Sequence, residues 1–467
     1  MKVLFVIDTR YIDQELLGIM HISAMLKRHG HACRAVDIAQ EQDLVQAVRQ
    51  YEPGLLACSA VTGSHRHLVR ASQQIKQALD LPSIFGGPHP SYFPELIEQE
   101  GVDIICRGEG EYPMLELVEA LEAGKDPTHI PNLWVKRDGH IHRNTPRPLV
   151  QDLDELPWPD RELLNAFASL HAEDSRYFMG GRGCPYDCTF CFNHIAKKLA
   201  EGQYVRWRSP ENLVSEIKAV KERYPLRFVN FQDDTFVLNL KWLEAFAQLY
   251  RQEIGLPFVC HVRANLVTDH MSQVLADAGC VHAVLGLESG NDHLRNMVLK
   301  KGISRQQLVD ACRSIKAHGI TVTTQNMFGV PFETIDTVLD TIELNVACQP
   351  DRTNLYFYTP YPNTQLAQIA IDQGFFQAQD LDNLPEEFTT EFSSVNLKLQ
   401  DARQIEQLAK LTRFCVHFPA FFPLIRLLFK QRGWDWAKAF VSTGLLRLQS
   451  TYTTLRGRSI RLLRPAQ

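Results

Sequence analysis

The sequence predicts an α/β protein: a doubly wound, Rossmann-like sheet comes first, followed by a partial (β/α)6 barrel of the TIM type and a helical C-terminal region. Two series of short apolar runs, separated by helical patterns, carry this prediction, because strands that alternate with helices pair in parallel. The second series has six repeats, too few for a closed eight-stranded barrel. The 467 residues leave room for two or three domains of ~100–200 residues each.

The first series has five apolar runs of strand length. Helices are expected between them, around 15–28, 41–51, 65–79, 91–99 and 111–123. The predicted strands are residues 2–8, 31–38, 54–60, 82–86 and 102–107. The segment 125–175, rich in proline and charge, is predicted to connect the domains, with a hairpin at 133–143 where Asp138-Gly139 forms the turn.

The second series begins with a strand at residue 176. Further strands are expected at 227–232, 257–263, 281–287, 320–327 and 354–359, with helices near 210–223, 240–253, 268–278, 304–318 and 333–346. We expect the chemistry at the carboxyl ends of these strands. The predicted domains are 1–135, a linker 136–172, the barrel 173–375 and a helical, basic region 376–467.

Charge is unevenly distributed along the chain. The formal net charge is -5, but residues 402–467 hold 12 Lys and Arg against Glu406 and Asp435, or +10, which leaves -15 for the first 401 residues. This excludes a nucleic-acid binder built on overall basicity, and no nucleic-acid partner is expected. The tail is a candidate for an anionic partner such as a membrane surface.

Nothing in the sequence predicts export or a membrane span. The N-terminus MKVLFVID enters a predicted strand with no leader pattern, so we expect a cytoplasmic protein. The longest apolar stretch, 414–429, is interrupted by Pro419, Pro423 and Arg426 and is shorter than the ~20 residues that span a bilayer.

Three closely spaced cysteines are the most informative residues. Cys184, Cys188 and Cys191 lie in the run GGRGCPYDCTFCFNH, directly after the first predicted barrel strand. In a reducing compartment such a group indicates metal or redox ligands. Structural zinc takes four ligands, and within the run only three cysteines are offered, with His194 as a conceivable fourth ligand. Three thiolates on an iron–sulfur cubane would leave one iron open, which favours catalysis over a zinc knuckle.

The Cys-x3-Cys-x2-Cys spacing resembles the signature of the radical S-adenosylmethionine (SAM) superfamily, which occupies the loop after the first strand of a partial barrel. The resemblance implies a [4Fe-4S] cluster whose free iron binds the amino and carboxylate groups of SAM. An electron from the cluster would cleave the sulfonium and give a 5′-deoxyadenosyl radical. Phe190 matches the aromatic position that packs on adenine, with ordinary core packing as the alternative.

Further motifs resemble this superfamily at the ends of successive strands. Asp233 and Asp234 follow the second strand; the resemblance implies that they accept hydrogen bonds from the ammonium of SAM, although such a pair also caps helices. Arg263, which ends the third strand, is a candidate partner for the SAM carboxylate or a plain surface arginine. Glu288 and Ser289 lie among glycines after the fourth strand, as ribose or carboxylate recognition requires.

Two turns depart from the superfamily's pattern. Val330 and Pro331, after the fifth strand, match the adenine-binding turn, but Phe332 replaces its second glycine, so a close approach of backbone to ligand is not assured there. Asn363 replaces glycine in a second element. Asparagine adopts left-handed turns, so this shape is expected to survive.

The first sheet lacks the G-x-G-x-x-G of a dinucleotide site and resembles cobalamin-binding domains instead. Their pattern is Asp-x-His-x-x-Gly, Ser-x-Leu and Gly-Gly after the first, third and fourth strands. Here Arg10 replaces the histidine and Asp13 the glycine. Because a guanidinium cannot ligate cobalt, the resemblance implies cobalamin without a histidine ligand at that position; His89 is a weaker candidate. The residues that correspond to the cobalamin site are Arg10, Ser59, Val61, Gly86, Gly87 and Glu109.

These resemblances imply a cobalamin-dependent radical SAM enzyme, most simply a methyltransferase that acts on an unactivated carbon of a small-molecule or lipid substrate. The alternatives are a radical oxidative cyclase, a transfer-RNA methylthiotransferase and a non-enzymatic corrinoid-binding protein. The methylthiotransferase would need three N-terminal cysteines for a second cluster, whereas Cys33, Cys58 and Cys106 lie in predicted strands.

The partners expected are the substrate and an electron donor such as flavodoxin or ferredoxin. The apolar, cation-fringed stretch 414–448, which includes Trp434 and Trp436, is a candidate for peripheral membrane contact. Packing of this stretch on the barrel is the favoured alternative.

Overall fold

The computed structural model describes the chain except residues 11, 13, 171–173, 379–394, 432–441 and 447–467. The described residues form two compact units: Met1–Tyr186 with Phe192–Phe258, and Asp187–Cys191 with the residues from Val259 onward. The predicted boundaries at residues 135, 172 and 375 remain a prediction. Part of the predicted tail, including Trp434 and Trp436, lies outside the described residues.

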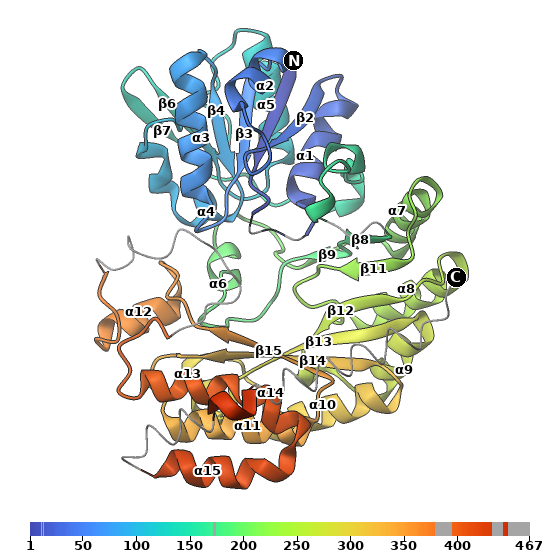
Figure 1. Ribbon diagram of the computed structural model, residues 1–467. Coiled ribbons are helices and arrows are strands. Elements are labelled where there is room, and N and C mark those ends of the chain that lie inside the picture. Colours follow the sequence, from blue (N-terminus) through green and yellow to red (C-terminus); the bar gives the residue numbers. More distant parts are fainter. Residues whose placement is uncertain (11, 13, 171–173, 379–394, 432–441, 447–467) are drawn as a thin grey trace. The chain divides into compact units, whose positions relative to one another are not determined.

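The first unit contains a seven-stranded sheet of order β2-β1-β3-β4-β5-β6-β7 (Figure 1). Strands β1 to β5 pair in parallel, and their order is that of flavodoxin-like folds, which bind ligands where the order reverses between β1 and β3. The strands are β1 (Lys2–Ile7), β2 (Ala32–Asp37), β3 (Leu55–Ser59), β4 (Ser83–Gly86), β5 (Ile104–Cys106), β6 (Leu133–Arg137) and β7 (His140–Arg143). All five parallel strands were predicted.

Helices cover both faces of this sheet, which confirms the doubly wound prediction. Alternate residues of β1 enter different cores: Val3 and Phe5 pack with α1 and α5, whereas Leu4 and Val6 pack with α2 and α3. The helices are α1 (Leu17–Arg28), α2 (Leu44–Tyr51), α3 (His65–Ala78), α4 (Pro88–Tyr92) and α5 (Glu111–Glu122), with a short 3-10 turn at Pro94–Glu98.

The predicted hairpin forms, but it extends the first sheet instead of standing alone in the segment that connects the domains. β6 pairs antiparallel with β5 and with β7. Asp138 and Gly139 both have positive φ angles, 49° and 76°, as a tight hairpin turn requires.

The second sheet has six strands in the order β15-β14-β13-β12-β11-β8, which confirms the predicted partial barrel. Its strands are β8 (Ser175–Phe178), β11 (Phe228–Phe231), β12 (Phe258–Val262), β13 (Cys280–Glu288), β14 (Thr321–Phe328) and β15 (Arg352–Phe357). A separate two-stranded ribbon, β9 (Gly181–Arg182) with β10 (Arg206–Trp207), was not predicted.

Local caps explain why the helices of this part begin where they do. Ser209 accepts from the amide of Asn212 and precedes Pro210 at the first helical position, a favourable start; Asn239 caps α8 in the same way. The helices are α6 (Asn193–Ala196), α7 (Pro210–Arg223), α8 (Leu240–Glu253), α9 (Asp269–Ala278), α10 (Arg305–Ala317), α11 (Ile335–Cys348) and α12 (Gln365–Asp372).

Helices make up most of the described part of the C-terminal region, as predicted. Helices α13 (Ala402–Lys410), α14 (Thr412–His417) and α15 (Phe422–Lys430) all pack on α11. No helix within the described ranges is long and apolar enough to span a bilayer.

Candidate active site

The three predicted cluster cysteines follow β9 within one stretch of eight residues. Cys184 and Cys188 are buried and Cys191 is half-buried. None of the eleven cysteines, all of which the structure describes, forms a disulfide. Among the described residues no three His, Cys, Asp or Glu side chains are gathered as a metal-binding group. The fit to a cluster therefore rests on three closely spaced thiols, the ligand type that iron–sulfur clusters use.

A cationic network in the second unit surrounds Cys188. Arg263 Nη1 lies 3.7 Å from the Cys188 sulfur, and its Nη2 donates to the carbonyl of Lys301. The ammonium of Lys301 lies 2.7 Å from Glu288 Oε1 and 5.8 Å from the centre of the Phe190 ring. The structure thus gathers three predicted SAM residues, Phe190, Arg263 and Glu288, around one lysine that the sequence analysis did not single out.

Left-handed backbone marks the predicted SAM turns. Glu288 has φ 65° and Phe332 φ 67°, so phenylalanine keeps the backbone form that glycine favours. Asn363, with φ 63°, confirms the predicted left-handed turn. The turn at Phe332 thus has the left-handed backbone of a glycine, and the close approach of this backbone to a ligand remains a prediction.

The adenine-type turn is held by a buried carboxyl group. Glu333 accepts from the amide of Gly329, and burial raises the pKa of Glu333 to about 8. Val330 and Pro331 are buried beside it. Ser289, fully buried, accepts from the amide of Asn291 at 3.3 Å, so its hydroxyl stabilises the chain that follows β13.

The two adjacent aspartates of the first unit have different surroundings. Asp233 is buried and accepts from the amides of Gly180 at 3.0 Å and Gly181 at 2.6 Å. Burial raises the pKa of its carboxyl to about 7, although those two hydrogen bonds lower it. Asp234 instead lines a cavity. Asp233 therefore supports the chain before Cys184, whereas Asp234 reaches the cavity, where a hydrogen bond with Asn193 partly offsets the rise in pKa that burial causes.

This cavity has a volume of about 480 Å³ and lies within the first unit. One wall comes from the carboxyl ends of β3, β4 and β5 and from α1, including Ser59, Gly86 and Gly87. The other wall includes Arg182, Gly183 and Asp234 from the segments around β9 and after β11. The volume suits a small-molecule or cofactor site, and the cavity lies at the carboxyl edge of the parallel strands, where open α/β sheets bind ligands.

The glycine pair fits a bulky ligand. A Cβ on Gly87, whose φ is 94°, would come within 3.0 Å of the carbonyl of Ala60 and 3.1 Å of Ser59 Oγ. A Cβ on Gly86 would meet only the Cβ of Cys106, at 3.9 Å. The protein therefore needs glycine at 87 for its own backbone, whereas at 86 a side chain would occupy the cavity.

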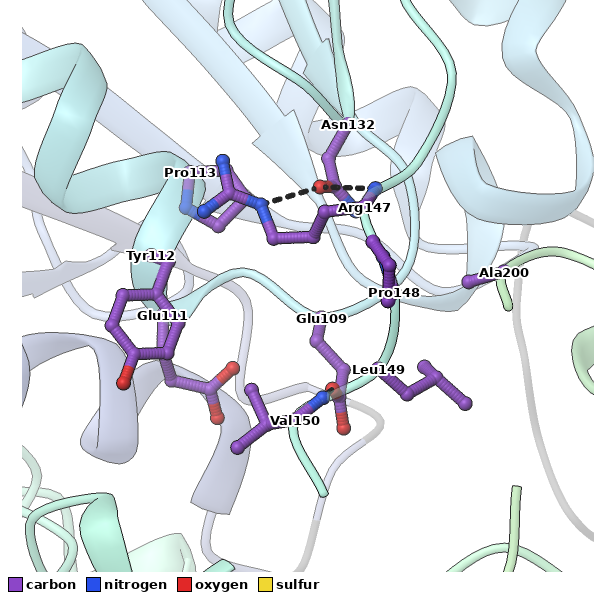
Figure 2. Close-up of a pocket in the computed structure, with 10 residues that line it drawn as sticks. All are labelled: Glu109, Glu111, Tyr112, Pro113, Asn132, Arg147, Pro148, Leu149, Val150 and Ala200. Carbon is purple, nitrogen blue, oxygen red and sulfur yellow. Dashed lines mark hydrogen bonds between the residues drawn. The ribbon is translucent and has the colours of Figure 1, made fainter. Parts of the chain in front are cut away.

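The carboxylate of Glu109 is already bound by other groups of the protein and is not free to bind a ligand. Its carboxylate bonds the amide of Val150 at 3.0 Å and pairs with Arg182 at 2.9 Å and Arg206 at 3.0 Å. Figure 2 shows Glu109 beside Val150, with Arg147 bonded to Asn132 above them.

The remaining predicted cobalamin residues do not line the cavity. Arg10 is held by Asp8 through Nε at 2.8 Å and Nη2 at 2.6 Å, and the carbonyl of Val61 accepts from His65. His89 stacks on His65 at 3.7 Å and its Nδ1 lies 3.0 Å from Thr62 Oγ1. Burial lowers the pKa of His89 to about 3.

The chain has a flavodoxin-like sheet with a cavity at its carboxyl edge. A partial barrel follows, with a cysteine triad after its first strand. Together these features define an α/β enzyme with two cofactor regions. Comparison with known proteins agrees. Residues 3–118 match the B12 binding domain and residues 179–344 match the Radical SAM superfamily. The chain belongs to the B12-binding radical SAM enzyme family, and a [4Fe-4S] cluster, SAM and cobalamin are its cofactors.

Several named proteins are similar in sequence to most of this chain. An uncharacterized methyltransferase of Pyrococcus horikoshii is 28% identical over 405 residues, 84% of this chain and 86% of its own length. An anaerobic magnesium-protoporphyrin IX monomethyl ester cyclase of Rubrivivax gelatinosus is 26% identical over 71% of this chain, which spans only 61% of that protein. The radical SAM methyltransferase TsrM of Kitasatospora setae has the same fold, with TM-score 0.65, 19% identity and coverage of 80% and 78%.

Proposed function

We propose that this enzyme transfers a methyl group to an unactivated carbon of a small-molecule substrate. The single observation that carries the proposal is the cavity of the first unit. It joins residues of the cobalamin-type sheet edge, such as Gly86, to Gly183 and Asp234, which belong to the SAM-type motifs. A methyl carrier and a radical source must act on one substrate, and a shared cavity supports their use together.

When bound, SAM and the cluster supply a carbon radical, and cobalamin carries the methyl group. The chain's own residues hold these groups and exclude water. Gly87 and Ser59 shape the sheet edge, Asp234 offers a carboxylate to the ammonium of SAM, and Arg263 with Lys301 offers positive charge beside Cys188 and Phe190. The Pyrococcus and Kitasatospora relatives are both named methyltransferases, which supports the reaction class.

Polar groups on β13, β14 and β15 favour a hydrogen-bonding substrate. Gln325 pairs in register with Gly286 and Asn354, and Met327 with Tyr356, so these side chains share one face. The opposite face of β14 is covered, since Thr324 Oγ1 donates to Asn345 of α11 at 2.7 Å. Amide and phenol groups on this half-buried face suit a hydrogen-bonding molecule better than a pure hydrocarbon. We propose flavodoxin or ferredoxin as the electron donor.

The experiment is anaerobic reconstitution with iron, sulfide and hydroxocobalamin, followed by incubation with methyl-deuterated SAM, a reductant and a cell extract. Methyl transfer predicts a deuterium-labelled small molecule, with S-adenosylhomocysteine and 5′-deoxyadenosine both formed. The matched controls are Cys188→Ala, which should lose the cluster's visible absorption and both products, and Cys33→Ala, which should lose neither.

Other outcomes would contradict the proposal. 5′-Deoxyadenosine without label transfer would indicate the oxidative cyclase reaction that the name of the Rubrivivax relative describes. Eight iron atoms per chain without cobalamin would indicate a methylthiotransferase. Full cluster content in Cys188→Ala would show that the triad is not the cluster site.

A further inference from the structure

Within the part of the chain that the structure describes, the C-terminal helices leave one apolar face exposed. Of the seven large apolar side chains that the described residues expose, three lie within seven residues: Phe421 is 47% exposed, Leu424 65% and Leu427 59%. Pro419, Ala420 and Pro423 are exposed beside them. Soluble proteins expose scattered apolar residues, but a contiguous set marks an interaction surface.

α15 is apolar on two faces, and only one of them is used for packing. Phe422, Ile425 and Phe429 are buried where the helix packs on α11. Leu424 and Leu427, three residues apart, lie on the other face. The favoured packing alternative thus holds for one face of α15, and it leaves the second face without a partner among the described residues.

Charge indicates what covers this face. Residues 402–431 carry five Lys and Arg against one acid, Glu406. Arg426 and Lys430 border the apolar face and reach Glu343 at 3.4 Å and Asp336 at 2.9 Å, yet both remain over a third exposed. The whole segment 402–467 is +10, whereas the rest of the chain is -15. A cationic apolar face on an otherwise acidic protein fits an anionic surface with a hydrocarbon interior.

We propose that the face formed by Phe421, Leu424 and Leu427, here called the α15 face, docks on an anionic lipid bilayer. The apolar side chains enter the boundary between head groups and acyl chains, and the cations, including Arg426 and Lys430, extend toward the lipid phosphates. This inference does not depend on the proposed reaction.

The test is co-sedimentation of the full-length protein with vesicles of phosphatidylcholine and phosphatidylglycerol, against vesicles of phosphatidylcholine alone. The wild type should partition onto the anionic vesicles, and the binding should weaken with added salt, which screens charge within ~10 Å at 0.1 M. The double variant Leu424→Gln/Leu427→Gln should lower the partition coefficient at least tenfold. Met297→Gln, which changes a side chain 67% exposed elsewhere in the same unit, should leave it unchanged.

Three results would overturn the proposal. They are no sedimentation of the wild type at low salt, equal sedimentation of the double variant, and self-association of the wild type that the double variant loses without any vesicle binding. The last would assign the α15 face to a second copy of the chain. Circular dichroism melting of each variant shows whether a lost signal reflects unfolding, and Leu424→Ala serves as a milder replacement if the double variant does not fold.

Discussion

Arg182, two residues before the first cysteine of the triad, donates from Nη2 to Oε1 of Glu111 at 2.6 Å. Glu111 is the first residue of α5 and Arg182 ends the short strand β9. Both side chains are largely buried and both line the cavity of the first unit. The chain that leads into the cysteine loop is therefore fixed to the cobalamin-type sheet by a buried ion pair.

Replacing Arg182 with methionine should destabilise the first unit strongly. The change leaves Glu111 buried without its partner, and breaking a buried pair costs about 3–5 kcal/mol. The matched control is Arg137→Met, which removes an ion pair with Asp126 whose two members are 48% and 49% exposed; the loss should be much smaller, because water and salt screen exposed ion pairs. Urea denaturation measures both. Equal losses in the two variants would contradict the importance of the buried pair.

The same pair predicts a dependence on acid. Burial raises the pKa of Glu111, but the charges of Arg182 and His21 outweigh burial and hold that pKa at about 2. A carboxyl pKa below its unfolded value, 4.5 here, gives stability that is complete above that value and is lost as the pH falls toward about 2. The loss amounts to about 3 kcal/mol. Denaturation between pH 4.5 and 2 should show a shallower decline in Arg182→Met; an unchanged slope would assign the pKa shift to another group.

The adjacent aspartates should separate into a structural and a ligand-binding role. Asp234→Asn should weaken SAM binding roughly 10- to 150-fold, because a charge-assisted hydrogen bond contributes about 1.5–3 kcal/mol, and should leave the melting temperature unchanged. Asp233→Asn should lower the melting temperature, because an amide has one acceptor oxygen for the two amides of Gly180 and Gly181. Equilibrium dialysis with labelled SAM on the reconstituted protein, with thermal melting, checks both. Loss of SAM binding in Asp233→Asn alone would reverse the assignment.

Local signals account for the parts of the fold that the sequence predicts well. The expected helices 210–223 and 240–253 coincide with α7 and α8, since Ser209 and Asn239 cap them from within the same stretch of chain. Buried parallel strands are continuous apolar runs, so β1 to β5 are visible without any partner. Asn363 was predicted correctly because its left-handed turn depends on the residue type itself.

Pairings between distant residues have no such signal. Lys301 lies 13 residues after Glu288, and the intervening π-helical turn Leu294–Val298 brings them together; the sequence analysis therefore missed the lysine beside Phe190. Arg182 was missed for the same reason, as its partners Glu109 and Glu111 lie more than seventy residues earlier. Charge pairing of this kind depends on tertiary packing, whereas hydrophobic periodicity does not.

Substitutions of the two glycines at the cavity should have different effects, one on stability and the other on cobalamin binding. Gly87→Ala should destabilise the fold by about 1–3 kcal/mol, because a φ of 94° is costly for alanine and its Cβ would be 3.0 Å from the carbonyl of Ala60. Gly86→Val should melt like the wild type but retain less cobalamin, since its side chain would occupy the cavity. Cobalamin absorbance after gel filtration and thermal melting distinguish these effects. Full cobalamin content in Gly86→Val would place the cofactor elsewhere.

The cobalt should have no nitrogen ligand from the protein. Arg10 occupies the position where related domains carry a histidine, and both of its bonds to Asp8 keep it in place. Electron paramagnetic resonance of the Co(II) protein should therefore lack the superhyperfine splitting of an axial nitrogen.

Arg10→His supplies a matched test of that position. The new imidazole would stand two residues from Asp8, whose carboxylate can orient it as carboxylates orient metal-bound histidines. Because position 10 does not line the cavity, nitrogen splitting should stay absent if the corrinoid binds there, and its appearance would move the cobalt toward Asp8. If the wild type already shows splitting, His67→Ala and His89→Ala identify its source: His67 Nδ1 lies 3.0 Å from Asp8, whereas His89 lies against Thr62 and His65. Splitting that either alanine variant abolishes would show that another imidazole has replaced the missing histidine as the cobalt ligand.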